Sequence, residues 1–225
     1  MGVNLNVPQI NIRQTLTELQ GLAARSKNLL KSLSARNDGQ VEHTVGWKDN
    51  VSGLAGAALH PSLTPELKEV VPGEKRYELA FATGNIAFCD PFHVNHDILP
   101  GAKVYPHVHW ETDHTDANDS VTWRMYYRRA KGHQQEAFSA EAFMDITQSV
   151  NSTAHTHMIA ECSDAQALVL NEPDELILIT LELLSATGFT PSKITAGDRV
   201  FGLTVDLHYE SSIIATKNKA PNFWW

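Results

Sequence analysis

The sequence predicts an all-β protein: an antiparallel, jelly-roll-like β-sandwich with an N-terminal extended arm and helix. Strand-like segments follow one another after residue 73 with turn residues between them, and no alternation of strands with long helices interrupts them. The chain has 225 residues, of which 42% are hydrophobic, enough for one large β domain. We therefore expect an attachment or oligomerisation section at 1–72 and the sandwich with its C-terminal tail at 73–225.

The N-terminal section begins with a polar stretch, 1–11, that is typical of an extended arm. Residues 12–33 predict a helix, because apolar residues recur at alternating intervals of four and three. This seam either packs on the chain's own body or joins copies of the chain in a helix bundle. Its assembly candidates are Ile12, Leu16, Leu19, Leu30 and Leu33.

Residues 34–63 contain many turn-forming residues and few periodic ones, which indicates a long loop. Thr64-Pro65-Glu66 has the pattern of a helix start, with Thr64 as the N-cap and Pro65 in the first helical position. The sequence therefore predicts a short helix that ends before Pro72.

The later segments alternate between apolar and polar residues. Gly84 predicts a turn or bulge in the first of them, and the polar loop 112–120 predicts an antiparallel hairpin between its two neighbours. In the last segment, Phe201, Leu203, Val205, Leu207 and Tyr209 are expected to face inward, and Thr204, Asp206, His208 and Glu210 outward. The expected strands are 76–88, 103–111, 121–129, 135–147, 155–162, 175–184 and 199–210.

The C-terminus ends in three aromatic residues, which are unfavourable when exposed to water. We expect them to dock on this chain or on a neighbour. These further assembly candidates are Phe223, Trp224 and Trp225.

Charge and composition exclude several classes of protein. The net charge of −8 argues against nucleic acid as a partner, because neutralising phosphates requires clustered Lys and Arg. No apolar run reaches the roughly 18 residues of a membrane span, and the first ten residues do not have the pattern of a signal peptide. Two isolated cysteines, Cys89 and Cys162, are typical of core residues in a protein assembled in a reducing cytosol.

The strand Tyr105-Pro106-His107-Val108-His109-Trp110 carries the strongest site hypothesis. His107 and His109 share one face about 7 Å apart, and His208 could join them if its strand is adjacent. The three are candidate metal ligands, and Glu111, Asp113 or His114 could complete the set. Alternatively, three chains contribute one His-x-His pair each to a structural metal, or the histidines line a polar face without any metal.

An enzyme reading rests on a weak likeness. Gly101 followed by His107-Val108-His109 resembles the start of the cupin metal motif over about 22 residues. Glu111 comes too early for that motif, Asp113 stands where its acid is expected, and no second half follows. No nucleophile elbow or phosphate loop is present either, so we expect no enzymatic activity and no cofactor beyond a possible structural metal at His107 and His109.

Two further patterns have alternative interpretations. His155-Thr156-His157 again puts two imidazoles on one strand face, which is typical of surface or interface histidines. Five aromatic residues raise the alternative of a carbohydrate-binding module, although we expect Trp110 and Trp123 to fill the core. These five are Trp47, Tyr105, Trp110, Trp123 and Tyr127.

Two passages together resemble a group of structural proteins from tailed-bacteriophage particles. The first is Pro106-His107-Val108-His109-Trp110, followed by an acidic loop and the strand 121–127. The second is 197–210, which ends in Asp206-Leu207-His208-Tyr209-Glu210. The resemblance covers about 76–218 and implies a non-enzymatic component of the virion, assembled in the host cytoplasm. Its implied partners are other copies of itself, which we expect as a trimer, and capsid, neck or tail proteins.

Overall fold

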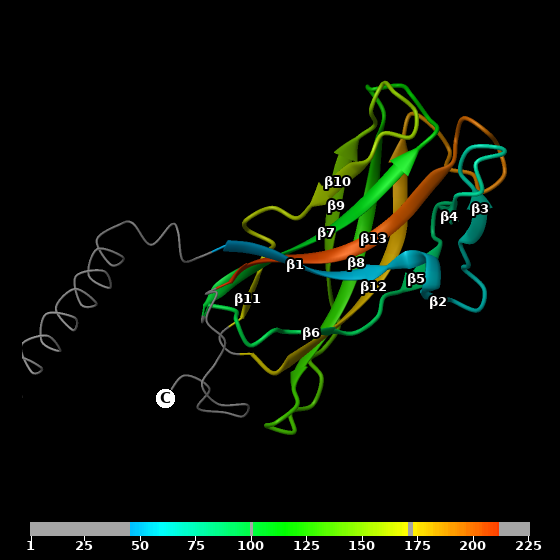
Figure 1. Ribbon diagram of the computed structural model, residues 1–225. Helices are drawn as coiled ribbons and strands as arrows, with labels where there is room; N and C mark the ends of the chain where they lie inside the picture. Colours follow the sequence, from blue (N-terminus) through cyan, green and yellow to red (C-terminus); the bar gives the residue numbers. More distant parts are fainter. Residues whose placement is uncertain (1–45, 100, 171–172, 212–225) are drawn as a thin grey trace, which may run out of the picture. The chain divides into compact units, whose positions relative to one another are not determined.

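The computed structural model describes residues 46–99, 101–170 and 173–211, which form thirteen strands and one short 3-10 helix (Figure 1). The elements, in chain order, are β1 (Gly46–Gly53), η2 (Leu54–Gly56), β2 (Ala58–Leu59), β3 (Glu66–Glu69), β4 (Tyr77–Phe81), β5 (Ile86–Phe88), β6 (Phe92–His93), β7 (Ala102–Thr112), β8 (Ser120–Lys131), β9 (Ala142–Ser149), β10 (Met158–Glu161), β11 (Leu168–Leu170), β12 (Glu175–Thr187) and β13 (Val200–Ser211).

These strands form two antiparallel sheets packed as a sandwich, which confirms the predicted fold class. The seven-stranded sheet has the order β10-β7-β13-β4-β3, with β1 paired to β13 and β11 paired to β7. The six-stranded sheet has the order β2-β5-β12-β8-β9, with β6 paired to β12. The long strands β7 and β13 are neighbours in the first sheet, and β8 and β12 in the second.

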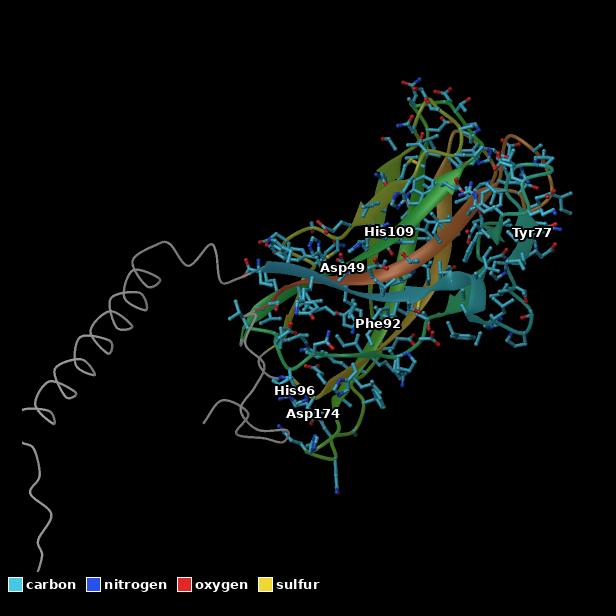
Figure 2. All side chains as sticks on the ribbon, in the orientation of Figure 1. Asp49, Tyr77, Phe92, His96, His109 and Asp174 are labelled. Carbon is cyan, nitrogen blue, oxygen red and sulfur yellow. The ribbon has the colours of Figure 1, made fainter. Side chains whose placement is uncertain are left out.

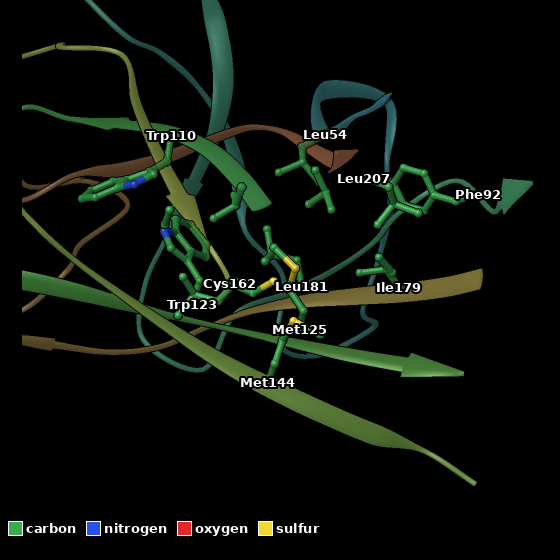
Figure 3. Packing of buried hydrophobic residues seen from close by; sticks show 14 of the residues in the cluster. Leu54, Phe92, Trp110, Trp123, Met125, Met144, Cys162, Ile179, Leu181 and Leu207 are labelled. Atoms are coloured by element: carbon green, nitrogen blue, oxygen red, sulfur yellow. The ribbon is translucent and has the colours of Figure 1, made fainter. Parts of the chain in front are cut away.

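Alternation of side chains explains how the long strands form the core. Val104, Val108 and Trp110 of β7 point between the sheets, where they meet Trp123 and Met125 of β8. Figure 3 shows this packing, with side chains from both sheets filling the space between them. The odd-numbered residues of β7 consequently face away from the core, on the outer face of the seven-stranded sheet.

The predicted hairpin around 112–120 is wrong. β7 pairs with β10, β11 and β13, whereas β8 pairs with β9 and β12 in the other sheet. The segment between β7 and β8 therefore crosses from one sheet to the other. A polar loop of this length can close a hairpin within one sheet or cross to the other sheet. Which of the two occurs depends on the strands with which β7 and β8 pair.

The start of the sandwich also differs from the prediction. β1 pairs with β13 over its whole length, from Gly46 opposite Ser211 to Gly53 opposite Thr204, so the sandwich begins well before residue 73. Residues Glu66–Glu69 form strand β3 on β4 instead of a helix. The Thr64 hydroxyl donates to the carbonyl of His60 at 2.6 Å and caps no helix.

The inward set predicted for the last strand is correct only in its second half. The register of β13 against β7 shifts between Gly202 and Thr204. Val205, Leu207 and Tyr209 lie in the main core, but Phe201 belongs to a small separate cluster with Val70 and Ala80. An extra residue in one strand reverses the faces on either side of it.

Several predictions fall on residues outside the described ranges. They concern the arm at 1–11, the helix at 12–33 with its five assembly candidates, and the aromatic terminus 223–225. Within the ranges that are described, no helix is long and apolar enough to cross a membrane.

Candidate functional site on the outer face of the seven-stranded sheet

The histidines of β7 lie on the outer face of the seven-stranded sheet, beside polar residues of its neighbours. The strand register places His107 opposite both Asp206 of β13 and Glu161 of β10. Asp49 of β1 lies opposite His208 of β13. Figure 2 shows Asp49 and His109 close together on this sheet, and both line an open pocket of about 370 Å³. Its other lining residues are His107, Ile159, Glu161 and His208.

Three side-chain atoms converge where His107 and His109 line this pocket. His107 Nε2 lies 3.1 Å from His109 Nε2, and His109 Nε2 lies 3.1 Å from Asp206 Oδ2. The third separation, from His107 Nε2 to Asp206 Oδ2, is 3.8 Å. His107 and Asp206 are buried and His109 is partly buried. Among the residues that the structure describes, these three form one of two groups whose ligand atoms are close enough to hold a metal ion.

The hydrogen bonds around the two imidazoles fix how they present their nitrogens. His107 Nδ1 lies 3.2 Å from the carbonyl oxygen of Tyr105, which can only accept, so this nitrogen carries the proton. His109 Nδ1 contacts His157 Nε2 at 2.6 Å. Burial lowers the pKa of His109; Asp206 opposes this, while the neighbouring His107 and His157 add to it. The neutral imidazole, the form that binds metals, is thereby favoured.

The third predicted ligand, His208, belongs to a second group with Asp49 and His107. His208 is partly exposed, and its Nδ1 lies 3.4 Å from Glu161 Oε2. Asp49 is exposed on β1. The structure thus brings His107 and His109 together as predicted. The third residue of their group is Asp206 and not His208, which forms a separate group with His107 and Asp49.

The two acids proposed from the sequence as further metal ligands form ion pairs with arginines instead. Glu111 is buried and forms an ion pair with Arg76 at 2.9 Å. Asp113 binds the guanidinium of Arg199 at 2.7 Å. Asp206 had been placed on the outward face of its strand by alternation, but the sequence contained no signal that this strand lies beside β7.

His114, also suggested as a ligand, instead lies between two carboxylates and a ring. Its Nε2 is 2.7 Å from Asp119 Oδ2, its Nδ1 is 3.5 Å from Asp198 Oδ1, and it stacks on Phe189 at 4.0 Å. Burial lowers the pKa of His114, but the hydrogen bonds to Asp119 and to the Gly197 carbonyl outweigh it and raise the pKa above its ordinary value.

We expect His114 to make stability depend on pH. Because its pKa is higher in the folded than in the unfolded chain, its contribution is complete below the unfolded value of about 6.5 and is lost as pH rises through the folded value. His114→Gln should therefore lose more stability, relative to the wild type, near pH 6 than near pH 8 in urea denaturation. Asp119→Asn is the control, and in that background the pH dependence of the His114→Gln effect should shrink. An equal loss at both pH values would contradict this role.

The pair His155 and His157 is not the shared strand face that the sequence suggested. His155 sits before β10 in a left-handed conformation, with φ 58°, and its Nδ1 is 3.8 Å from Glu111 Oε2. His157 instead contacts His109, one of the three residues of the candidate metal group. The turn preceding β10 breaks the alternation on which the prediction depended.

The aromatic residues divide between the core and the outer face. Trp110 and Trp123 are fully buried, as predicted, and are not accessible to a glycan. Trp47 is 54% exposed and packs edge-on against His208 and Tyr105, with ring centroids 4.7 and 5.8 Å away.

The two cysteines have the properties of core residues. Cys162 is buried in the main core, and Cys89 is partly buried against it. Burial raises the pKa of each thiol to about 12, so neither is a reactive thiolate near neutral pH.

Comparison with known proteins gives distant likenesses of structure. No protein-family model matches the chain, and no curated protein matches it. An insecticidal delta-endotoxin from Bacillus thuringiensis is 13% identical with a TM-score of 0.37, over 71% of this chain and 24% of the toxin. The VP2 subviral particle of infectious bursal disease virus is 8% identical with a TM-score of 0.36, over 80% of this chain and 35% of VP2.

A phage protein is also among these structures. The enzymatically active domain of tailspike protein 4 from bacteriophage CBA120 is 12% identical with a TM-score of 0.28, over 77% of this chain and 20% of that one. The chain thus spans well under half the length of all three structures. At these values the likenesses assign no function to the chain.

Proposed function

We propose that this chain is a structural component of a tailed-phage particle, without enzymatic activity, in a head-decoration, neck or tail-fibre-anchoring position. It would assemble in the host cytoplasm as a homo-oligomer, with a trimer as the expected form, and contact other capsid, neck or tail proteins in the virion. The outer face of the seven-stranded sheet would be the contact between copies.

The observation that carries this proposal is the set of apolar side chains exposed on that face. Trp47 and Val51 of β1 are 54% and 56% exposed, and Ile159 of β10 is 45% exposed. Val51 lies opposite Asp206, and Ile159 lies opposite His109, so apolar side chains flank the histidines on both sides. The outward face of a sandwich sheet is ordinarily polar, and aromatic residues are enriched at protein interfaces.

The sequence resemblance supports the same surface. Its two passages, around His107-Val108-His109 and around Asp206-Leu207-His208, lie on β7 and β13, which are paired neighbours. These two parts of the resemblance therefore meet in one place, between the exposed side chains of β1 and β10, whereas its remaining strand, 121–127, belongs to β8 in the other sheet.

The oligomeric state of the full-length chain tests the proposal. We expect the wild type to have the mass of a trimer or larger ring by size exclusion with light scattering. Trp47→Ser combined with Ile159→Ser should shift that mass towards the monomer, because both changes remove apolar contact area from the interface. Far-UV circular dichroism should stay unchanged.

Phe143→Ser is the matched control, because Phe143 is 56% exposed but lies on β9 of the other sheet. It should leave the mass unchanged. A monomeric wild type, or a double variant that assembles as well as the wild type, would overturn the proposed interface. Specific binding of a glycan that depends on Trp47 in a monomeric chain would instead favour the carbohydrate-binding alternative.

A further inference from the structure

We propose that His107, His109 and Asp206 form a binding site for one divalent transition-metal ion within each chain. This site differs from a metal shared by His-x-His pairs of three chains, because the third ligand comes from β13 of the same chain. It is also independent of the proposed assembly, since no residue of a second copy is needed.

The first argument is the spacing of the three ligand atoms. Their separations of 3.1, 3.1 and 3.8 Å define a circle with a radius of about 2.0 Å, close to the bond lengths of about 2.0–2.2 Å that zinc makes to imidazole nitrogen and carboxylate oxygen. An ion at or slightly above the centre of this triangle can therefore reach all three atoms without moving them.

The second argument is the number of protons available. The Tyr105 carbonyl fixes the proton of His107 on Nδ1, so neutral His107 directs a bare Nε2 lone pair into the centre. Asp206 Oδ2 is also an acceptor. If His109 Nε2 carries a proton, that one proton must be shared between two acceptors, His107 Nε2 and Asp206 Oδ2. A cation at the centre can instead bind all three atoms at once, each through a lone pair.

The third argument is an unpartnered atom on a buried carboxylate. Asp206 is 5% exposed, and its second oxygen, Oδ1, is buried with no hydrogen-bond partner among the described residues. The nearest groups that could balance its charge are the imidazoles of His107 and His109. A buried carboxylate that lacks a full opposite charge is unfavourable, and a bound cation supplies that charge.

The donor set indicates the class of metal. Two imidazoles and one carboxylate suit zinc, iron, manganese or nickel, whereas calcium and magnesium prefer oxygen ligands throughout. Three protein ligands leave at least one coordination position, and two of these ligands, His107 and His109, line the open pocket together with Ile159 and Glu161. The outer contact of His109 with His157 would hold the ring in its ligating orientation.

Metal binding to the tag-free, full-length protein tests the site. After chelator treatment and removal of the chelator, calorimetry with Zn²⁺ should show one ion per chain. Asp206→Asn keeps the shape of the side chain but removes its charge, and it should weaken binding at least about a hundredfold, since loss of an outer-shell partner alone costs about 10–100-fold. His109→Gln should weaken binding to a similar extent.

The matched control is Asp49→Asn, which removes the carboxylate of the second possible group and should leave the affinity within about threefold of wild type. Circular dichroism establishes that each variant is folded. Equal binding by Asp206→Asn and wild type would overturn the proposal, as would loss of binding in Asp49→Asn alone. A stoichiometry of one ion per three chains, or no binding of Zn²⁺, Mn²⁺, Fe²⁺ or Ni²⁺, would overturn it too.

Discussion

Replacing Trp123 with alanine should destabilise the protein by about 3–5 kcal/mol, the range for a buried Trp or Phe truncated to alanine. Trp123 of β8 is fully buried and meets Phe81 and Trp110 of the opposite sheet, with ring centroids 5.2 and 6.3 Å away. The truncation would leave a cavity between the two sheets. Because folded domains are stable by only about 5–15 kcal/mol, the midpoint of urea denaturation should fall markedly.

Phe143 and the neighbouring tryptophan Trp110 provide controls for this prediction. Phe143→Ala should cost less than about 1 kcal/mol, because the side chain is 56% exposed and lies outside the proposed interface. Trp123→Phe should cost much less than alanine, since the indole nitrogen of Trp123 has no hydrogen-bond partner among the described residues. Trp110→Phe should cost more than Trp123→Phe, because Trp110 donates to Gln148 at 2.7 Å. Equal midpoints for Trp123→Ala and wild type would contradict the packing described above.

Replacing Arg199 with alanine should also cost about 3–5 kcal/mol, as expected when one partner of a buried ion pair is removed. Arg199 Nε donates to Asp113 Oδ2 at 2.7 Å, and the two side chains are only 13% and 8% exposed. The same guanidinium donates to the carbonyls of Glu69 and Val70 at 2.9 and 3.0 Å. The Arg199 side chain thus connects the end of β3 with the residue that precedes β13.

Arg128→Ala is the matched control, since Arg128 pairs with Glu141 at 3.7 Å with both side chains about half exposed. That change should cost less than about 1 kcal/mol in the same urea titration. In a double-mutant cycle, Arg199→Ala with Asp113→Ala should be less destabilised than the sum of the single variants, because it leaves no buried unpaired carboxylate. Additive costs would show that the pair is not coupled.

The strands that the sequence predicted most accurately are those with strict alternation. Residues 103–111 and 199–210 became β7 and β13, with bounds within one or two residues of the prediction. β1 was missed because its side chains are mostly exposed, with Ser52 as its single fully buried residue. Its pairing with β13 holds it in the sheet, and backbone pairing of this kind leaves no apolar pattern in a sequence.

In the candidate site, too, alternation predicted the faces of single strands but not which strands are neighbours. Alternation placed His107 and His109 on one face and Asp206 on the outward face of a distant segment. It did not show that the register would set Asp206 opposite His107, or that Asp113, the acid nearer in sequence, would bind Arg199 instead. The separation of 99 positions between His107 and Asp206 is bridged only by strand pairing.

The sequence by itself determined the all-β class, the inward and outward faces of β7 and of the second half of β13, the burial of Trp110 and Trp123, and the pairing of two imidazoles on one face. These depend on the two-residue period of a strand, which is a local property of the chain. The tertiary structure alone decided which strands are neighbours, where the register shifts, and which carboxylate meets the histidines. Strand order and register arise from contacts between residues far apart in the chain, which no local pattern specifies.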